Sequence, residues 1–445
     1  MMRVKSARNC VAAAATLLAS LLTAASVADA PSPAASGQRM ASRLEALSAF
    51  GANPEGGVSR VAFSAADIQG REYIMSLMRS AGLEVRVDTA GNIIGRSEGS
   101  KPDLPAIMFG SHIDSVPGGG NYDGDVGVIG AIEVAQVLLE RGIRTRHPLE
   151  VVSFTDEEGG LTGSRAITVG LQDSALDVIS HSGLSIRDGI RAVGGDPERL
   201  GEAIRGPGEL LAFVELHIEQ GASLFEQGIN IGVVEGIVGI RWWDVVVEGF
   251  ANHAGTTPMN RRRDAMISAA ELTLAVNRIA NSMDGRQVAT VGRIRAEPGA
   301  PNVIPGRVVM SLEIRDLAAA RMQQVFAAIA VEAGNIAEKN GTAIRFDEID
   351  VASPPAPTDE SMRRIIANVA EELDLTYVRM PSGAGHDAQD MTHIAPTGMI
   401  FVPSVDGISH SPQEFTTTAD MANGANVLLR TVLMLDNGAL DLPED

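Results

Sequence analysis

Histidine and acidic residues follow three apolar segments of this sequence, and their types are those of metal ligands. The first segment leads into FGSHIDSVPGGGNYDGDVGVIG (109–130), the second into DEEGG (156–160) and the third into HIEQG (217–221). Imidazole nitrogen and carboxylate oxygen are ligands of zinc and related ions. An acidic turn or a satisfied surface histidine would explain any one of these groups alone. Three such groups after three apolar segments indicate a metal site.

Two His-and-carboxylate sets that share one ligand can be drawn from these groups and one later histidine. Their members are His112, Asp123, Glu158, His217 and His410. Two zinc ions about 3.5–4 Å apart need such a set, with one carboxylate bridging them. Asp123 is the natural bridge, because the glycines around it allow the backbone to bring it back beside His112. His and carboxylate also suit manganese, cobalt or nickel, so the sequence does not fix the metal.

The acids next to these ligands have two readings each. Asp114, two residues after His112, could accept the other ring N–H of that histidine and fix its tautomer, or it could be a solvated loop acid. Paired metal ions lower the pKa of a bound water toward about 7, and a base must carry the proton to the leaving nitrogen. Glu157 and Glu158 are adjacent, and their spacing leaves open which is the ligand and which the base.

Three further residues could contact a substrate. His253 lies between small residues in a loop and could donate to a developing oxyanion. Arg315 ends an apolar segment and could pair with a substrate carboxylate, or else with Asp316 or Glu313. Asn302 lies in a loop between two prolines and could bind the same carboxylate.

Composition narrows the class of protein. The chain has 445 residues, with 45% hydrophobic and 21% charged residues, so it can bury a sizeable core. A net charge of −20 argues against a nucleic-acid partner, whose phosphates require a basic surface. A small-molecule partner is expected instead. The one cysteine, Cys10, lies near the N-terminus, which excludes disulfides and cysteine-ligated zinc from the rest of the chain.

The first thirty residues have the features of a secretory signal peptide. Arg3, Lys5 and Arg8 form a basic region, residues 11–27 are apolar and small, and Ala28-Asp29-Ala30 resembles a cleavage site. The apolar run is shorter than the ~20 residues of a membrane span, which disfavours an uncleaved anchor. We therefore expect an exported protein, periplasmic or secreted, without a membrane association after cleavage. Residues 31–40 are rich in Pro, Ser and Ala and suggest a flexible lead-in.

The elements that must position the metal-type residues are those of an α/β sheet. The segments 105–109, 149–155, 210–216 and 398–403 read as buried strands, and 125–141 as a helix. Open α/β sheets bind ligands at the carboxyl ends of their strands. Residues 236–352 have a β-α-β-β-α pattern that indicates a second domain inserted into the first. The predicted parts are a signal peptide (1–30), a lead-in (31–40), a catalytic domain in two parts (41–235 and 353–445) and the insertion (236–352).

Eight motifs together resemble one family. They are GSHIDSVPGGGNYDGDVGV, FTDEEG, HIEQG, FANHAGTTPMNRRRDA, PNVIPG, EIRD, SGAGHDAQDM and ISHSPQE. The set is similar to the hydantoinase/carbamoylase branch of the dizinc aminoacylase and carboxypeptidase superfamily, over about residues 40–435. That branch includes N-carbamoyl-L-amino acid hydrolases, β-ureidopropionases and allantoate amidohydrolases. The resemblance implies a zinc-aminopeptidase-like three-layer α/β catalytic domain with a smaller α+β lid and dimerisation domain.

The resemblance also implies roles for individual residues. It places two Zn²⁺ ions on the five ligands named above and makes Glu157 the base. It implies that His253 reaches across a homodimer interface into the partner's site. It assigns substrate binding to Gln220, Asn302, Arg315, Ser382, Gly383 and Ala384. The Gly-rich loop with His386 has, from its pattern alone, an equal chance of being a simple turn.

The activity implied is metal-dependent cleavage of the linear C–N bond of an N-carbamoyl-L-amino acid or related ureido acid. An allantoate amidohydrolase, or an aminoacylase or dipeptidase, is the nearest alternative. A solute-binding protein is the alternative outside enzymes, and the intact ligand set with Glu157 argues against it. Two features depart from the family pattern: a shorter loop at 159–165, which would alter the wall of the substrate pocket, and the export signal.

Overall fold

The structure is a computed structural model that describes residues 33–440. The predicted signal peptide, residues 1–30, lies outside the described residues. Helix α1 (Gly37–Ser48) begins inside the segment expected to be a flexible lead-in. The Ser36 side chain accepts a hydrogen bond from the Arg39 N–H, and the Ser36 N–H donates to Glu133 of a later helix. These bonds satisfy backbone groups at the helix start, so the helix begins before the apolar pattern does.

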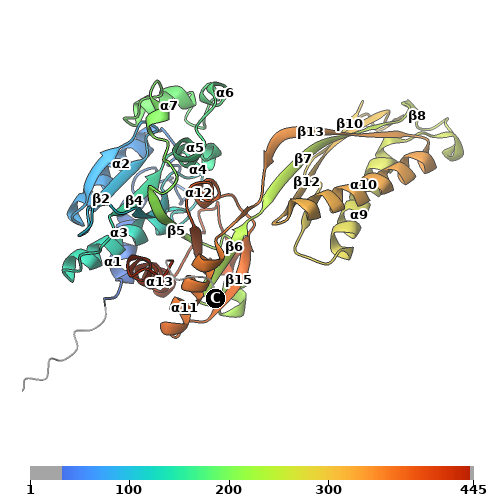
Figure 1. Cartoon of the computed structure of the whole chain (residues 1–445). Helices are drawn as coiled ribbons and strands as arrows, with labels where there is room; N and C mark the ends of the chain where they lie inside the picture. The colour runs from blue at the N-terminus through green and yellow to red at the C-terminus, as the bar shows by residue number, and fades with distance from the viewer. Residues whose placement is uncertain (1–32, 441–445) are drawn as a thin grey trace, which may run out of the picture. The chain divides into compact units, whose positions relative to one another are not determined.

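A nine-stranded sheet forms the larger part of the molecule (Figure 1). In spatial order its strands are β1 (Glu84–Val87), β2 (Ile93–Ser97), β4 (Leu149–Phe154), β3 (Ala106–His112), β5 (Leu210–Ile218), β16 (Thr397–Val402), β6 (Ile231–Ile237) and β14 (Ala356–Pro357), with β15 (Tyr377–Ser382) also on β6. The four central strands run parallel, so their carboxyl ends meet at one edge. β3, β4 and β16 are buried at every position, as parallel strands covered on both faces should be.

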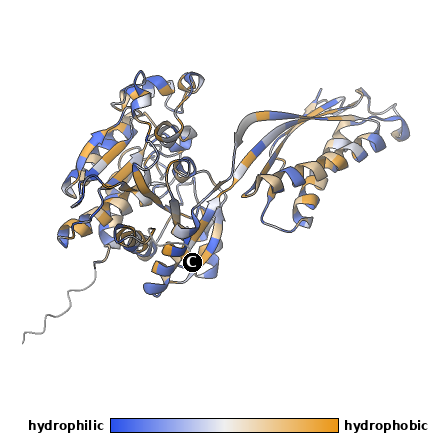
Figure 2. Cartoon of the chain, viewed as in Figure 1, coloured by the Kyte–Doolittle hydropathy of each residue, from blue (hydrophilic) through white to orange (hydrophobic). Residues whose placement is uncertain are grey.

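Helices cover both faces of this sheet. One face packs against α1, α2 (Ala65–Ser80), α3 (Asp125–Glu140), α11 (Glu360–Glu372) and α13 (Thr418–Asp436) in one apolar core. The other packs against α5 (Thr162–Thr168) and α12 (Asp387–Met391) in a second core. The longer helices carry hydrophobic and hydrophilic residues side by side (Figure 2), as expected between core and solvent. This arrangement confirms the predicted three-layer α/β domain.

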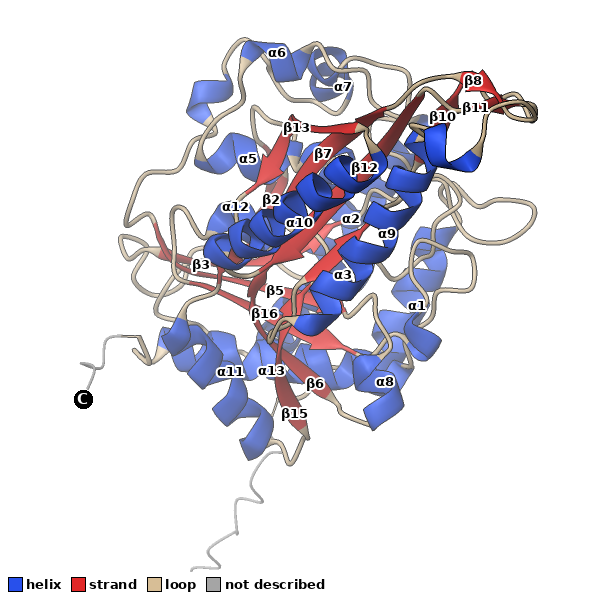
Figure 3. Ribbon diagram, turned by 90° about the vertical axis from the view of Figure 1, so that its right-hand side faces the viewer, coloured by secondary structure: helices blue, strands red, loops and turns tan. Residues whose placement is uncertain are grey.

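A second, antiparallel sheet lies within the insertion. Its strands are β10 (Ile294–Glu297), β12 (Arg307–Asp316), β7 (Gly239–Glu248) and β13 (Ala343–Ser353), with β9 (Val288–Thr290) also on β12. Helices α9 (Ala265–Ser282) and α10 (Ala319–Asn340) lie side by side against it (Figure 3). Burial alternates along β12, because one face meets the helices and the other does not. The smaller α+β domain is therefore also confirmed.

Three details differ from the sequence reading. The pattern of residues 233–250 predicts antiparallel strands of the insertion, but β6 belongs to the large sheet, because it is buried between β16 and β15. The pattern of residues 288–295 predicts one strand, whereas the structure has two, β9 and β10. The sequence does not predict β15, since residues 377–381 are only half-buried and have no clear apolar alternation. No helix within residues 33–440 combines the length and apolar character needed to cross a bilayer.

Candidate metal and active site

The turn from β3 into α3 brings Asp123 toward His112. His112 ends β3 and is buried, and its Nδ1 lies 3.0 Å from the backbone oxygen of Asp114, which leaves Nε2 free to bind a metal. Gly124 has a φ of 68°, and a Cβ there would lie 2.4 Å from the His112 ring. Only glycine fits this close approach. Glycine at position 124 thus lets the turn bring Asp123 beside His112, as predicted. The distance from His112 Nε2 to Asp123 Oδ1 is 3.9 Å.

Asp123 lies between two other histidines. Its Oδ1 is 3.1 Å from Nε2 of His217, and its Oδ2 is 3.0 Å from Nε2 of His410. His217 lies near the end of β5, and its Nδ1 contacts the Ile218 carbonyl at 2.9 Å, so its Nε2 is the nitrogen that faces Asp123; this Nε2 also accepts the Gly124 N–H at 3.2 Å. Each carboxylate oxygen thus faces a different histidine, which is the geometry that a bridging ligand needs.

The structure brings all five predicted ligands together in two groups. Possible ligand atoms of His112, Asp123 and His217 lie within 4.8 Å of one another, and so do those of Asp123, Glu158 and His410. His410 Nε2 is 3.4 Å from Glu158 Oε1. A third group, Glu215, His217 and His386, shares His217 with the first. The donor set contains imidazole nitrogen and carboxylate oxygen only, which fits zinc and similar divalent ions.

The electrostatics of the cluster suit a cation. Burial raises the pKa of Asp123, but hydrogen bonds from His217 and His410 outweigh it and hold that pKa well below its usual range. Against the cost of burial, the hydrogen bond to Asp123 raises the pKa of His217 to about 9. Burial and then the charge of Asp123 raise the pKa of Glu158 to about 8. A divalent ion bound here would offset the negative charge of several buried acids.

Glu157 stands beside the ligands without being grouped with them. Its Oε2 lies 3.6 Å from His112 Nε2. Burial, and then the charges of Asp387 and Glu158, raise the pKa of Glu157 well above its usual range. A carboxylate with a raised pKa is a stronger proton acceptor, which suits a general base.

Asp114 is buried at the site, but its contact differs from the expected one. The ring nitrogen of His112 is 3.0 Å from the Asp114 carbonyl and 3.7 Å from its carboxylate. The expected carboxylate–histidine hydrogen bond is therefore replaced by a backbone one. The Asp114 carboxylate instead accepts the backbone N–H groups of Glu157 at 3.3 Å and Glu158 at 3.2 Å. It positions the acidic turn rather than the histidine tautomer.

Glu414 is a residue that the sequence reading missed. Its Oε1 accepts the backbone N–H of Asp123 at 3.0 Å, and its Oε2 accepts the Ser409 hydroxyl at 2.8 Å and the His410 N–H at 3.3 Å. One buried carboxylate thus holds the backbone of two ligand-bearing loops. The available signal was its place at the end of the ISHSPQE motif that contains His410.

Arg60 is the second missed residue. It is fully buried, donates to the Ile113 carbonyl at 2.7 Å and pairs with Asp125. It therefore connects the segment after His112 to the start of α3. A single arginine remote from every motif gave no signal in the sequence.

Gln220 lies against the cluster. Its Nε2 donates to Asp123 Oδ2 at 2.8 Å. Gln220 and His410 both have left-handed backbone conformations, with φ of 58° and 53°. Such strain in residues other than glycine gathers at functional sites.

Arg315 and the 382–384 loop meet at the edge of a pocket of about 670 Å³, which Gln220 also lines. Arg315 donates to Glu313 at 2.8 Å and to the Gly383 carbonyl at 2.7 Å, so the ion-pair alternative is the one formed. Ser382 Oγ is 2.8 Å from Nε2 of His386. His386 is buried, with its ring 4.4 Å from that of His217, so the Gly-rich loop carries a residue of the site and is more than a turn.

His253 and Asn302 are brought together elsewhere, at the two-stranded antiparallel β8–β11 sheet, which is formed by β8 (Asn252–His253) and β11 (Val303–Ile304) from distant parts of the sequence. Both residues are exposed. The Nδ1 atom of His253 accepts the N–H groups of Gly255 at 3.0 Å and Thr256 at 3.2 Å. Nε2 therefore carries the proton and is a donor. Within residues 33–440, no hydrogen bond or ion pair joins either residue to the metal-type cluster.

Comparisons with known proteins agree with this site. The profile of peptidase family M20/M25/M40 matches residues 108–434. The chain is 43% identical to the N-carbamoyl-L-amino acid amidohydrolase of Geobacillus stearothermophilus, over 90% of this chain and 99% of that one. It is 35% identical to the allantoate amidohydrolase of Escherichia coli K12, over 88% and 96%.

A solved structure shows the same likeness. The hydantoinase/carbamoylase family amidase of Burkholderia multivorans superimposes with a TM-score of 0.83 and is 36% identical, over 91% of this chain and 99% of that one. The residues matched by the family profile, 108–434, include the five predicted ligands. The chain therefore belongs to peptidase family M20/M25/M40, and within it to the hydantoinase/carbamoylase amidases.

Proposed function

We propose that this protein hydrolyses the linear C–N bond of an N-carbamoyl-L-amino acid or a closely related ureido acid. The observation that carries the proposal is Asp123, whose two carboxylate oxygens face His217 and His410. The likeness to an N-carbamoyl-L-amino acid amidohydrolase over nearly the whole of both chains supports the substrate class.

We propose a dinuclear site for Zn²⁺, which Mn²⁺, Co²⁺ or Ni²⁺ could replace. His112, Asp123 and His217 would hold one ion, and Asp123, Glu158 and His410 the other. The ions would supply Lewis acidity, which polarises the carbamoyl group and acidifies water at neutral pH.

The residues of the chain then divide the remaining work. Glu157 takes a proton from the attacking water and delivers it to the leaving nitrogen. The C–N bond to the amino acid breaks, and the carbamic acid formed decomposes to CO₂ and ammonia. His253 steadies the developing oxyanion with its Nε2–H. Gln220, Asn302, Arg315 and the loop of Ser382, Gly383 and Ala384 orient the substrate.

We propose that the protein acts as a homodimer in which His253 serves the partner's site. His253 and Asn302 are exposed, and their hydrogen bonds are made within the β8–β11 sheet and its adjoining loops. A symmetric dimer would bring this sheet to the metal ligands of the partner without a rearrangement of either chain.

The test is a substrate panel with added Zn²⁺, Mn²⁺ or Co²⁺. We expect ammonia release from N-carbamoyl-L-amino acids. Faster release from allantoate would favour the second candidate, which the likeness to an allantoate amidohydrolase supports. Release of an amino acid from a dipeptide without ammonia would instead indicate an exopeptidase. A substrate preference other than the expected one would be attributed to the short 159–165 loop, which would alter the wall of the substrate pocket.

We also propose that the protein is exported. The basic residues 3–8, the apolar run 11–27 and the Ala28-Asp29-Ala30 site support this. N-terminal sequencing of the protein from the expressing cell tests it, with Pro31 as the expected first residue. A protein that retains residues 1–30 would contradict the proposal.

A further inference from the structure

The pocket beside Gln220 is lined by more basic than acidic side chains, in a strongly acidic protein. Its lining contains three arginines, Arg286, Arg315 and Arg379, and one acid, Glu219. The chain as a whole carries −20. Guanidinium groups that face a hollow can bind an anionic ligand when they leave their present carboxylate partners.

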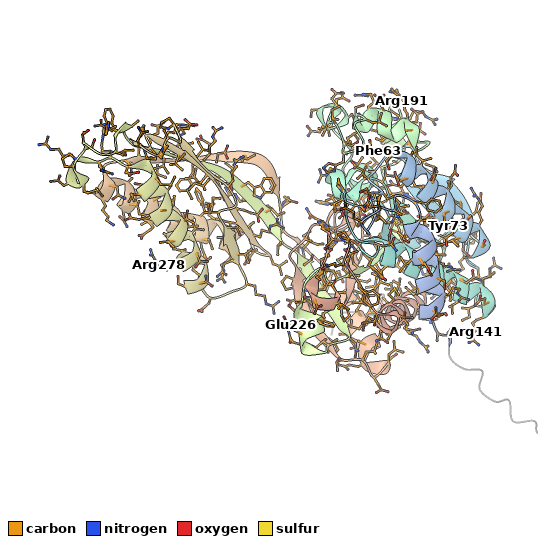
Figure 4. The ribbon with its side chains drawn as sticks, turned by 180° about the vertical axis from the view of Figure 1, so that it is seen from behind. Phe63, Tyr73, Arg141, Arg191, Glu226 and Arg278 are labelled. Atoms are coloured by element: carbon orange, nitrogen blue, oxygen red, sulfur yellow. The ribbon has the colours of Figure 1, made fainter. Side chains whose placement is uncertain are left out.

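The acid of the lining is already engaged. The Glu219 carboxylate accepts the backbone N–H groups of Ser223 at 2.9 Å and Leu224 at 2.7 Å. These belong to α8 (Ser223–Gln227), the short helix that bears Glu226 in Figure 4 and whose Ser223 and Gln227 also line the pocket. Glu219 thus holds α8 in place, and the three arginines pair with other acids, Glu235, Glu313 and Glu360.

Two of these arginines have partners that a ligand can replace. Arg379 is 3.0 Å from Glu360, which also binds Arg363, so one carboxylate serves two guanidinium groups. Arg286 is 2.9 Å from Glu235, and its side chain is 61% exposed. Exposed ion pairs of this kind contribute little to stability. Both groups can therefore turn to a bound carboxylate.

The pocket adjoins the metal-type cluster. Gln220 lines it and donates to Asp123 at 2.8 Å. A volume of about 670 Å³ accommodates a small organic acid with room for both ends. A substrate with its carbamoyl group at the cluster and its α-carboxylate near Arg315 would extend its side chain toward Arg286 and Arg379.

We infer that Arg286 and Arg379 form a second anion subsite, so that the preferred substrates are N-carbamoyl-L-amino acids with an acidic side chain. The inference rests on the proposed function. A guanidinium binds a carboxylate through two parallel hydrogen bonds, which the uncharged amide of the same shape cannot reproduce. The subsite therefore selects for charge more than for size.

Matched substrates test this directly. N-carbamoyl-L-aspartate and N-carbamoyl-L-glutamate are compared with N-carbamoyl-L-asparagine and N-carbamoyl-L-glutamine, which differ in one charge. We expect kcat/KM to be at least about tenfold higher for the acids in the wild-type protein. Arg379→Gln and Arg286→Gln should each remove most of that preference while leaving the amides within about twofold. Arg278→Gln is the control, since Arg278 is an exposed arginine of α9 paired with Glu332 outside this pocket (Figure 4).

Binding separates the inference from the proposed function. Glu157→Gln protein is titrated with N-carbamoyl-L-aspartate and N-carbamoyl-L-asparagine by calorimetry. Tighter binding of the acid, lost in Glu157→Gln/Arg379→Gln, supports the subsite even if turnover is absent. Equal binding of acid and amide, or equal effects of the arginine variants on both, overturns the subsite. If N-carbamoyl amides are turned over in that case, the proposed function stands without it.

Discussion

The residues proposed to act on the substrate are held in two different ways. At the carboxyl edge of the nine-stranded sheet, His112, Asp123 and His217 are buried and receive contacts from backbone carbonyls, backbone N–H groups and each other. At the β8–β11 sheet, His253 and Asn302 are exposed, and the hydrogen bonds that hold them are local. The metal ligands are thus preorganised in the core of one chain, whereas the β8–β11 sheet presents its side chains to solvent.

This contrast predicts that loss of a ligand or of its supports at the sheet edge should affect metal binding as well as chemistry, whereas damage at the β8–β11 sheet should affect chemistry alone. The edge has several interdependent supports, so a single change there alters more than one group. At the β8–β11 sheet the donor is His253, whose tautomer is fixed by the N–H groups of Gly255 and Thr256. Four experiments can break or sharpen the comparison.

Glu157→Gln should have the largest effect on rate. The amide cannot accept a proton, so kcat should fall by about 10²–10⁴. Metal content and melting temperature should stay near the wild-type values, because Glu157 is not among the grouped ligands. Steady-state kinetics with metal analysis measures both. Glu226→Gln, on exposed α8, is the control. A variant with both metals and near-normal turnover would remove Glu157 from the mechanism.

His253→Ala should lower kcat by about 10²–10³ without loss of metal, as expected for one oxyanion donor. If His253 serves the partner's site, mixing His253→Ala with Glu157→Gln protein should recover activity. In a randomly mixed dimer, one site in the mixed pair is intact, so recovery should reach about a quarter of the wild-type level. Mixtures that remain inactive after subunit exchange would show that His253 acts at the site of its own chain, or that no dimer forms.

The same contrast explains what could be predicted from the sequence. The ligands lie next to buried parallel strands, and an apolar run followed by His or Asp is a local signal; all five predicted ligands come together. Glu414 and Arg60 act through backbone groups of remote segments. Glu414 shares a motif with His410, but the sequence around neither residue predicts the contact with the remote segment. Arg315 had two readings because an ion pair with Glu313 and a free guanidinium have the same local pattern.

Turns set the other limit. The sequence predicts that the glycines of this turn provide conformational freedom. The structure gives a second reason for Gly124, because a Cβ at this position would lie 2.4 Å from the His112 ring. The same holds for Gly120, where a Cβ would lie 2.1 Å from Glu414 Oε1. The composition of a loop shows that glycine is used, and only the packed partner shows why.

Glu414→Gln should weaken metal binding by about 10–100-fold, as loss of an outer partner of metal ligands does. Its two oxygens accept only N–H and O–H donors, so the amide NH₂ would face a donor on one side or the other. Zinc titration with a competing chelator measures the affinity. Gln413→Ala changes an exposed neighbour and should leave the affinity unchanged. Unaltered affinity in Glu414→Gln would mean that the loops hold their geometry without this carboxylate.

Asp264→Ala should have the smallest effect, and it tests whether the two regions are energetically separate. Asp264 caps α9 by accepting the N–H of Met266 at 2.9 Å, and loss of such a cap costs about 1 kcal/mol. Thr417 caps α13 in the same way through the Asp420 N–H at 3.1 Å, and Thr417→Ala is the matched variant in the other core.

Every proposed metal ligand lies on an element of the nine-stranded sheet or its loops, so bound metal should stabilise that region by about 2.7 kcal/mol at a hundred times Kd. Urea unfolding with and without chelator should show this gain for the transition that Thr417→Ala shifts. The transition that Asp264→Ala shifts should not respond to chelation. If both variants shift one common transition that depends on metal, the insertion and the metal ligands unfold together. The β8–β11 sheet would then depend on the edge of the nine-stranded sheet for its stability as well as for its chemistry.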